Sequence, residues 1–140
     1  MKRIIFIILT GFVTLVCGNF PAMAQGQGKT LVVYFSESGN TRNMANIISE
    51  LSGADLVEIE MQHPYSDNYS TLLDEAERDL IANARPPLHT HIENMDEYDT
   101  VLVGYPNWYA ILPMPVYTFL ESYDFSGKRI IPFCSHGNGM

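Results

Sequence analysis

A short polar segment, Ser36-Glu37-Ser38-Gly39-Asn40-Thr41, has the residue types that could bind an anion. A loop between a strand and a helix presents backbone N–H groups, hydroxyl groups and the positive end of the helix dipole. The segment contains no lysine and matches neither glycine-rich nucleotide pattern, G-x-x-x-x-G-K-[ST] or G-x-G-x-x-G. These features favour a phosphate held by neutral hydrogen bonds. A helix cap formed by Ser38 or Asn40, with no ligand, is an equal alternative.

Two adjacent aromatic residues in Pro106-Asn107-Trp108-Tyr109 could cover a flat ligand. Exposed aromatic side chains in a loop are costly unless they stack on something. Asn107 tolerates a positive φ better than most residues, so the peptide there could turn over. The alternative is that Trp108 and Tyr109 pack beneath the following helix, and the sequence leaves the two interpretations even.

A third polar segment begins with Ser135-His136-Gly137, after the apolar run 129–134. Other residues with reactive side chains lack partners in the sequence. His89 and His91 could be two metal ligands, but no third ligand lies nearby, so we predict no metal site. Cys134 ends an apolar run and is expected to be a buried thiol. Because no nucleophile, base and acid can be assigned together, no catalytic residue is predicted.

Hydrophobic patterns indicate the elements that must position these three segments. Apolar and β-branched runs predict strands over 30–35, 55–60, 100–105 and 129–134. Helical spacing predicts helices over 42–51, from Asp67 or Ser70 to Pro86-Pro87, and over 113–123. Their expected apolar faces are, in turn, Met44, Ile47, Ile48 and Leu51, then Leu73, Ala76, Leu80 and Ala84, then Val116, Phe119 and Leu120.

Strands that alternate with helices predict an α/β fold, a doubly wound parallel sheet with helices on both faces. The alternating run 55–60 is typical of an edge strand. In such sheets ligands bind at the carboxyl ends of the strands. Each polar segment follows an apolar strand, so we expect all three segments to lie along one edge of the sheet.

The order of these motifs resembles the flavodoxin-like family. Ser-x-Ser-Gly-Asn-Thr follows the first strand, and an aromatic pair follows the third. The chain most closely resembles a bacterial group with N-A-R-P before the third strand and F-C-[ST]-H-G after the fourth, here 83–86 and 133–137. The segments 113–116 and 119–125 also resemble that group. Each motif is weakly specific, but five in the right order over 29–140 are strong.

The resemblance implies non-covalent binding of flavin mononucleotide, FMN. It implies a phosphate loop, a loop that stacks on the isoalloxazine ring and responds to its redox state, and a loop on the other side of the ring. The matching residues are, in that order, Ser36, Ser38, Gly39, Asn40 and Thr41; Pro106, Asn107, Trp108 and Tyr109; and Ser135, His136 and Gly137. Two residues depart from the pattern. Glu37 places a carboxylate beside the phosphate, which is tolerable only if it points to solvent, and Ala110 stands where the group often has glycine.

Residues 1–24 have the pattern of a cleaved signal peptide. Lys2-Arg3 precede the apolar run 4–16, which is shorter than the roughly 20 residues that a membrane-spanning helix needs. Ala22-Met23-Ala24 matches a signal-peptidase site. We predict export to the periplasm or the medium, with no stable membrane span after cleavage, a flexible lead-in over 25–28 and a flavodoxin-like domain over 29–140.

The charge balance bears on the partners of the protein. With 16 acidic and 8 basic residues the net charge is −8, which argues against nucleic-acid binding. Acidic surfaces steer towards basic partner proteins, and negative surroundings lower the potential of a bound flavin. We predict an exported electron-transfer protein that serves redox partner proteins. The alternatives are a flavin-dependent NAD(P)H:quinone oxidoreductase on the same fold and a non-functional fragment that binds no cofactor.

Flavodoxin-like domains continue beyond the fourth strand with a helix, a fifth strand and a last helix. This sequence ends at Met140, so we expect a C-terminally incomplete fold that lacks the last helix–strand–helix. The fourth strand would then be an apolar sheet edge, and residues 25–140 would fold poorly alone. A short variant completed by a partner chain is the alternative.

Overall fold

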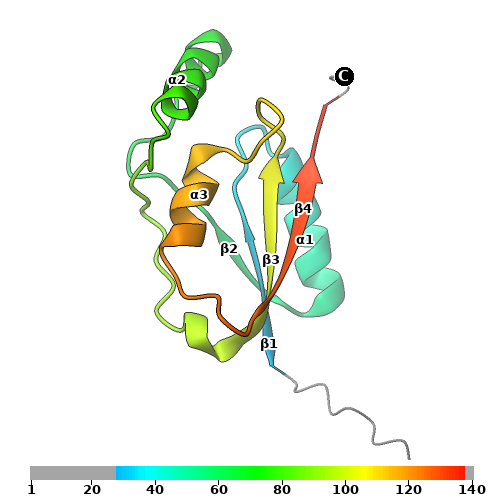
Figure 1. Cartoon of the computed structure of the whole chain (residues 1–140). Helices are drawn as coiled ribbons and strands as arrows, with labels where there is room; N and C mark the ends of the chain where they lie inside the picture. Colours follow the sequence, from blue (N-terminus) through cyan, green and yellow to red (C-terminus); the bar gives the residue numbers. More distant parts are fainter. Residues whose placement is uncertain (1–27, 138–140) are drawn as a thin grey trace, which may run out of the picture.

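Four strands and three helices alternate along residues 28–137, the part of the chain that the computed structural model describes (Figure 1). They are β1 (Lys29–Tyr34), α1 (Asn40–Ser52), β2 (Asp55–Glu58), α2 (Tyr69–Ile81), β3 (Tyr98–Pro106), α3 (Met114–Glu121) and β4 (Arg129–Ser135), with a 3₁₀ turn over Met95–Glu97. The element order is the predicted one. The predicted signal peptide, residues 1–24, lies outside the described residues. Between residues 28 and 137, no helix is long and apolar enough to cross a membrane.

The four strands form one parallel sheet in the order β2-β1-β3-β4. β1 and β3 are central, and Leu31, Val32, Val33 and Val101 are fully buried. These strands are apolar on both faces because helices cover both faces of the sheet. The parallel sheet of the predicted α/β fold is confirmed, and the carboxyl ends of all four strands meet at one edge.

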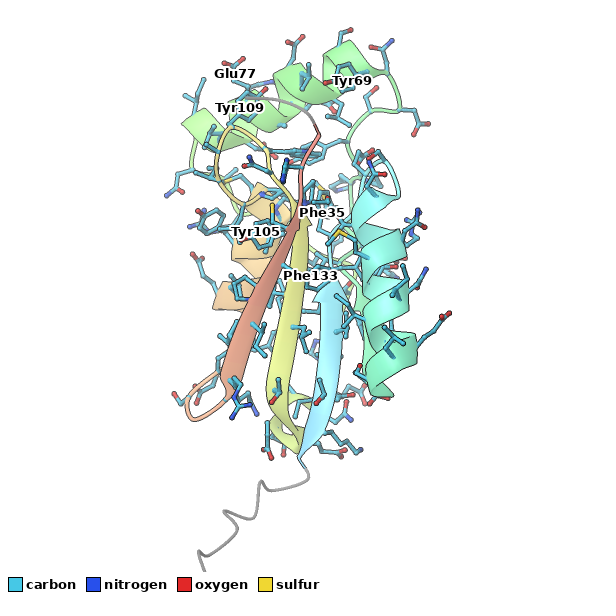
Figure 2. The ribbon with its side chains drawn as sticks, turned by 90° about the vertical axis from the view of Figure 1, so that its right-hand side faces the viewer. Phe35, Tyr69, Glu77, Tyr105, Tyr109 and Phe133 are labelled. Atoms are coloured by element: carbon cyan, nitrogen blue, oxygen red, sulfur yellow. The ribbon has the colours of Figure 1, made fainter. Side chains whose placement is uncertain are left out.

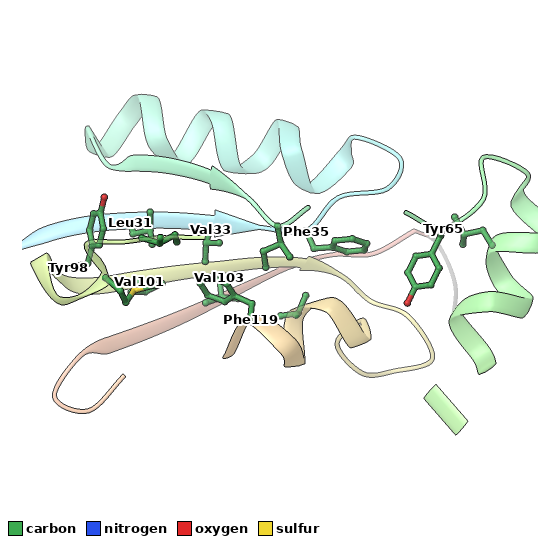
Figure 3. Packing of buried hydrophobic residues seen from close by; sticks show 13 residues of the cluster. Leu31, Val33, Phe35, Tyr65, Tyr98, Val101, Val103 and Phe119 are labelled. Atoms are coloured by element: carbon green, nitrogen blue, oxygen red, sulfur yellow. The ribbon is translucent and has the colours of Figure 1, made fainter. Parts of the chain in front are cut away.

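α1 covers one face of the sheet and α3 covers the other (Figure 1). On the α3 side, a large cluster of buried side chains extends from the sheet to the helix. It includes Leu31, Val33, Phe35, Val103 and Phe119 (Figure 3). A smaller cluster on the α1 side contains the residues of β1 that point the other way. The larger cluster therefore lies directly beneath the loop that follows β3.

The buried face of α1 includes Ile48 of the predicted face but not its other residues. Thr41 and Ala45 are buried, whereas Ile47 and Leu51 are 56% and 85% exposed. Residues 41, 45 and 48 form one stripe along the helix, since residues three and four apart are neighbours. The small side chains of Thr41 and Ala45 let α1 approach the sheet closely, and the bulkier stripe points away from it.

The bounds of α2 also differ from the prediction. Its N-cap is Asn68, whose Oδ1 accepts hydrogen bonds from the N–H groups of Ser70 and Thr71. Asp67 and Ser70, the predicted caps, lie one residue before Asn68 and two after it. The helix ends at Ile81, before the two prolines, because Asn83 takes a left-handed conformation with φ 48°.

α2 lies beyond the carboxyl edge of the sheet and not on its face (Figure 1). Leu72 and Ala76 are its buried residues, whereas Leu73, a predicted core residue, is 38% exposed. Leu72 belongs to the cluster against which Trp108 packs, in the loop after β3. α2 therefore forms a wall beside that loop.

β4 is the outer strand of the sheet within the described residues. Ile130 and Ile131 are 44% and 40% exposed and point to opposite faces. The predicted apolar sheet edge is confirmed for this part of the chain. Cys134 was expected to be buried but is exposed, and it lies in the outer strand of the sheet that the described residues form.

Candidate functional site

Three loops meet at the carboxyl edge of the sheet, next to Phe35, Tyr105 and Tyr109 (Figure 2). They follow β1, β3 and β4, as predicted. The first is the loop 36–41, which leads into α1. Gly39 is the N-cap of α1 and has a left-handed backbone with φ 85°. A side chain there would meet no atom within 4 Å, so the conformation and not the space favours glycine.

The loop 36–41 presents a run of unused backbone donors. Arg42 N–H donates to Ser36 Oγ at 3.2 Å, and Asn43 N–H donates to the carbonyl of Gly39 at 2.9 Å. Within residues 28–137, the N–H groups of residues 37 to 41 donate to no protein acceptor. Consecutive free N–H groups at a helix N-terminus form a binding site for an anion.

The predicted cap of α1 by Ser38 or Asn40 does not form. The N-cap residue Gly39 has no side chain, and Ser36 Oγ accepts only the N–H of Arg42 from the first turn of α1. Ser38 Oγ accepts a hydrogen bond from Asn40 Nδ2 at 3.2 Å, so these two residues bind each other instead of the helix end. Thr41, in the first turn of α1, is only 1% exposed. The loop 36–41 therefore places at this edge the hydroxyl groups of Ser36, Ser38 and Thr41 together with the free N–H groups of residues 37–41.

The cation next to the loop 36–41 is paired with a carboxylate and does not face the loop as a free charge. Arg42 is the nearest cation, and its guanidinium donates to both carboxylate oxygens of Glu58, at 2.6 and 3.3 Å. These hydrogen bonds raise the pKa of Arg42 above its usual value. Glu37 is exposed, and its pKa is raised by partial desolvation and by the nearby Asp67. An anion in the loop would thus be held by neutral donors.

The aromatic loop after β3 contains a tight two-residue turn. Trp108 and Ile111 exchange two backbone hydrogen bonds, at 2.9 and 3.2 Å. Between them, Tyr109 and Ala110 have φ values of 52° and 64°. Turns with two positive φ values strongly prefer Asn-Gly, so two ordinary residues store strain here. The positive φ values fall on these two residues and not on Asn107, the residue of this loop that the sequence analysis noted as tolerating one.

The two aromatic residues of this loop have different surroundings. The Trp108 ring packs edge-on against Phe35, with centroids 5.6 Å apart, and tilted against Tyr65 at 5.8 Å. Trp108 is thus half-buried at the border of the core. Tyr109 is 47% exposed, and its hydroxyl donates to the carbonyl of Leu73 in α2 at 3.2 Å. Tyr109 is therefore the aromatic side chain that the loop offers to solvent or to a ligand.

Ser135 joins the three loops. Its carbonyl accepts a hydrogen bond from Asn107 N–H at 2.9 Å, and it pairs with Pro106 in the register of β3 and β4. Its hydroxyl shares a hydrogen bond with Thr41 Oγ1, at 2.6 Å. His136 and Gly137 follow and are exposed. The structure thus places all twelve predicted site residues along one edge, because β1, β3 and β4 are parallel and their carboxyl ends lie together.

Tyr65 is a residue of this region that the sequence analysis did not single out. It is buried, its ring lies against Trp108, and its hydroxyl donates to Asp79 at 2.8 Å. Burial and the carboxylate of Asp79 raise the pKa of Tyr65. The sequence signal that could have identified Tyr65 was its position directly after Pro64, in the loop that follows β2. Tyr65 also lines a cavity of about 320 Å³ that borders Ser36 and Glu37.

His89 and His91, the two possible metal ligands in the sequence, do not lie in a cluster of metal-binding side chains within the described residues. Among the residues that the structure describes, no group of three or more His, Cys, Asp or Glu side chains could hold a metal ion. His91 instead stacks on Tyr123, with ring centroids 6.4 Å apart.

Residues 29–140 match the family model of flavodoxin. The chain belongs to the flavodoxin family. Its fold is similar to crystal structures of proteins named as flavoproteins from Bacteroides eggerthii and Bacteroides uniformis, with 31% and 35% identity. Both alignments have a TM-score of 0.71 and cover 80% of this chain, against 73% and 74% of those chains.

A further flavodoxin-like structure is a flavoprotein from Lactobacillus acidophilus in complex with FMN. It is 25% identical, with a TM-score of 0.70 over 80% of this chain and 77% of that chain. No curated protein matches the chain. The flavodoxin-like fold is shown by the family match and by these structures together.

Proposed function

We propose that this member of the flavodoxin family binds FMN at the carboxyl edge of its sheet and carries electrons. The observation that carries the proposal is the run of free N–H groups from Glu37 to Thr41 at the start of α1. Such a run fits a phosphate group. The related flavoprotein from Lactobacillus acidophilus, solved with FMN, supports the choice of this cofactor.

Each loop has a role in this proposal. Ser36, Ser38 and the N–H groups of the loop 36–41 bind the phosphate, and the charge of the phosphate is offset by the dipole of α1. The turn at Tyr109-Ala110 holds the edge of the ring, with Tyr109 as the exposed aromatic contact. His136 and Gly137 border the ring on the other side. Bound FMN would supply the redox chemistry, and the protein would orient it and set its potential.

The acidic surroundings of the site fit an electron carrier. The exposed side of α2 carries Asp74 and Glu77, close enough to Tyr109 to raise the pKa of its hydroxyl alongside desolvation. Negative charge near the ring disfavours the reduced, anionic flavin and lowers the potential. The same charge would steer the protein towards a basic redox partner.

Flavin titration of the purified chain tests the binding. We expect saturable binding of one FMN per chain, tighter than that of riboflavin, which lacks the phosphate. Gly39→Ala and Gly53→Ala form a matched pair, because both glycines are left-handed, with φ 85° and 69°, and neither has an atom near the new β-carbon. Each substitution should cost about 1–2 kcal/mol of stability.

Only Gly39→Ala should weaken FMN binding, by about tenfold, because it alters the loop that holds the phosphate. An unaltered FMN affinity in Gly39→Ala, or a wild-type chain that takes up no FMN, would contradict the proposal. Steady oxidation of NAD(P)H by the FMN-loaded chain would instead favour the reductase. Reduction only through a partner reductase would support the carrier.

We also propose that the protein is exported. The support is the sequence pattern of residues 1–24, with Ala22-Met23-Ala24 before Gln25. Mass spectrometry of the protein from the producing cells should find Gln25 as the first residue. A chain that begins at Met1, or that is acylated at Cys17, would overturn this proposal.

A further inference from the structure

The hydroxyl groups of Thr41 and Ser135 are 2.6 Å apart, although 94 positions separate the two residues in the sequence. Thr41 lies in the first turn of α1, and its N–H is one of the free donors of the loop 36–41. Its side chain is buried. This hydrogen bond therefore connects the start of α1 directly to the carboxyl end of β4.

Ser135 is itself held by the backbone of β3. Its carbonyl accepts the N–H of Asn107 at 2.9 Å, and the strand register places it beside Pro106. The Ser135 hydroxyl is thus a fixed partner for Thr41. It is not a freely rotating group at the end of the chain, even though β4 is the outer strand among the described residues.

The chemistry of a phosphate decides the direction of this hydrogen bond. A phosphate group accepts hydrogen bonds, and a hydroxyl group has only one hydrogen to donate. If Thr41 donates to a phosphate, its oxygen is left to accept, and Ser135 must then donate to Thr41. A hydroxyl that accepts one hydrogen bond is polarised and donates a stronger one.

We propose that Ser135 is a positioning residue for the phosphate end of the flavin, and that it acts through Thr41. This differs from the role beside the ring that the family resemblance implied for Ser135. It rests on the proposed function, since it assumes a phosphate in the loop 36–41. The same geometry would serve any ligand that ends in a phosphate monoester at this loop.

The test compares FMN with riboflavin, which carries the same ring without the phosphate. Ser135→Ala should weaken FMN binding by about fivefold to tenfold, the effect of one hydrogen bond, and change riboflavin binding less than twofold. Ser135→Thr keeps the hydroxyl and should restore most of the FMN affinity. In a Thr41→Val background, Ser135→Ala should have no further effect. Ser122→Ala, which removes a serine hydroxyl from the exposed end of α3, is the control.

Two outcomes overturn the inference. An equal loss of FMN and riboflavin affinity in Ser135→Ala would place Ser135 at the ring. An unchanged FMN affinity would give it no role in binding. Melting of each variant without ligand separates either result from a loss of folding.

Inorganic phosphate provides a readout that does not depend on the ring. Phosphate should raise the melting temperature of the wild-type chain and raise that of Ser135→Ala by less. If phosphate stabilises the wild-type chain more than Ser135→Ala but FMN does not bind, the proposed function fails, and Ser135 still positions a phosphate group at the loop 36–41. If phosphate stabilises neither chain and FMN does not bind, both are wrong.

Discussion

The Phe133 ring in β4 lies over the backbone of Gly104 in β3, its direct partner across the strands. A β-carbon on Gly104 would lie 2.2 Å from Cζ of Phe133. The ring therefore occupies the space that a side chain at position 104 would need. Phe133 also packs against the cluster on the α1 side, which includes Val32 and Tyr34. The pair covers this face of the sheet two residues before Pro106, where the aromatic loop begins.

Gly104→Ala should destabilise the protein. The new methyl group has to displace the Phe133 ring, and overpacking of this kind costs about 1–3 kcal/mol. Chemical denaturation would measure the loss of unfolding free energy. Gly137→Ala, where a β-carbon meets no atom within 4 Å, should be close to neutral. Adding Phe133→Val should recover part of the stability lost in Gly104→Ala, and strictly additive losses would argue against the clash.

Ala110→Gly should stabilise the aromatic loop. Ala110 has φ 64°, a left-handed conformation that glycine adopts without a steric penalty. The free energy of unfolding should rise by about 1 kcal/mol. Ala82→Gly is the matched control, because Ala82 ends α2 with φ −75° and should lose stability. Stabilisation in both variants, or in neither, would show that strain at position 110 is absent.

Glu37→Gln should make FMN binding less dependent on pH. The pKa of Glu37 is raised by desolvation and by Asp67, with Arg42 acting in the opposite direction. A carboxyl group with a raised pKa is protonated below that pKa, so its repulsion of a phosphate is present above the pKa and disappears as the pH falls. The substitution should therefore tighten FMN binding at pH 7, and its effect should shrink towards pH 4.

Riboflavin provides the control for this prediction, since it has no phosphate for Glu37 to repel. Its affinity should be the same in both chains at pH 7. FMN affinities that run parallel from pH 7 to pH 4 would mean that Glu37 points away from the ligand.

Glu121→Gln should destabilise the protein at neutral pH but not at acidic pH. Arg85 donates two hydrogen bonds of 2.8 Å to Glu121, and these bonds lower the pKa of the Glu121 carboxyl group. A lowered pKa stabilises the folded chain above the unfolded value near 4.5, and this contribution is lost as the pH falls through the folded pKa. Melting temperatures of wild type and Glu121→Gln should differ at pH 7 and converge near pH 3. Glu50→Gln, on α1, is the control and should show no such convergence.

The Arg85 contacts also give a physical reason for the N-A-R-P motif. Besides Glu121, Arg85 donates to the carbonyl groups of Asn83 and Ala84 and lies over the Tyr117 ring, 5.2 Å from its centroid. The motif thus ties the end of α2 to α3. The sequence analysis could recognise the motif but not these contacts, because Glu121 is 36 residues away.

Local chemistry explains which predictions for the helices were right and which were wrong. The start of α3 near Pro113 was predicted correctly because proline favours a first helical turn on its own. Ile47 and Leu51 were wrongly predicted to lie on the buried face of α1 because hydrophobicity alone selected them. The residues that α1 buries are the smaller Thr41 and Ala45, which allow the helix to approach the sheet closely.

The sequence by itself determined the order of strands and helices, the parallel sheet and the edge at which three polar loops meet. These features follow from local patterns and from the chain direction, since parallel strands bring their carboxyl ends together. Only the tertiary structure decided that Trp108 packs inward while Tyr109 stays exposed, and that Ser135 binds Thr41. Such contacts depend on distances between residues far apart in the chain, which packing sets and no local pattern encodes.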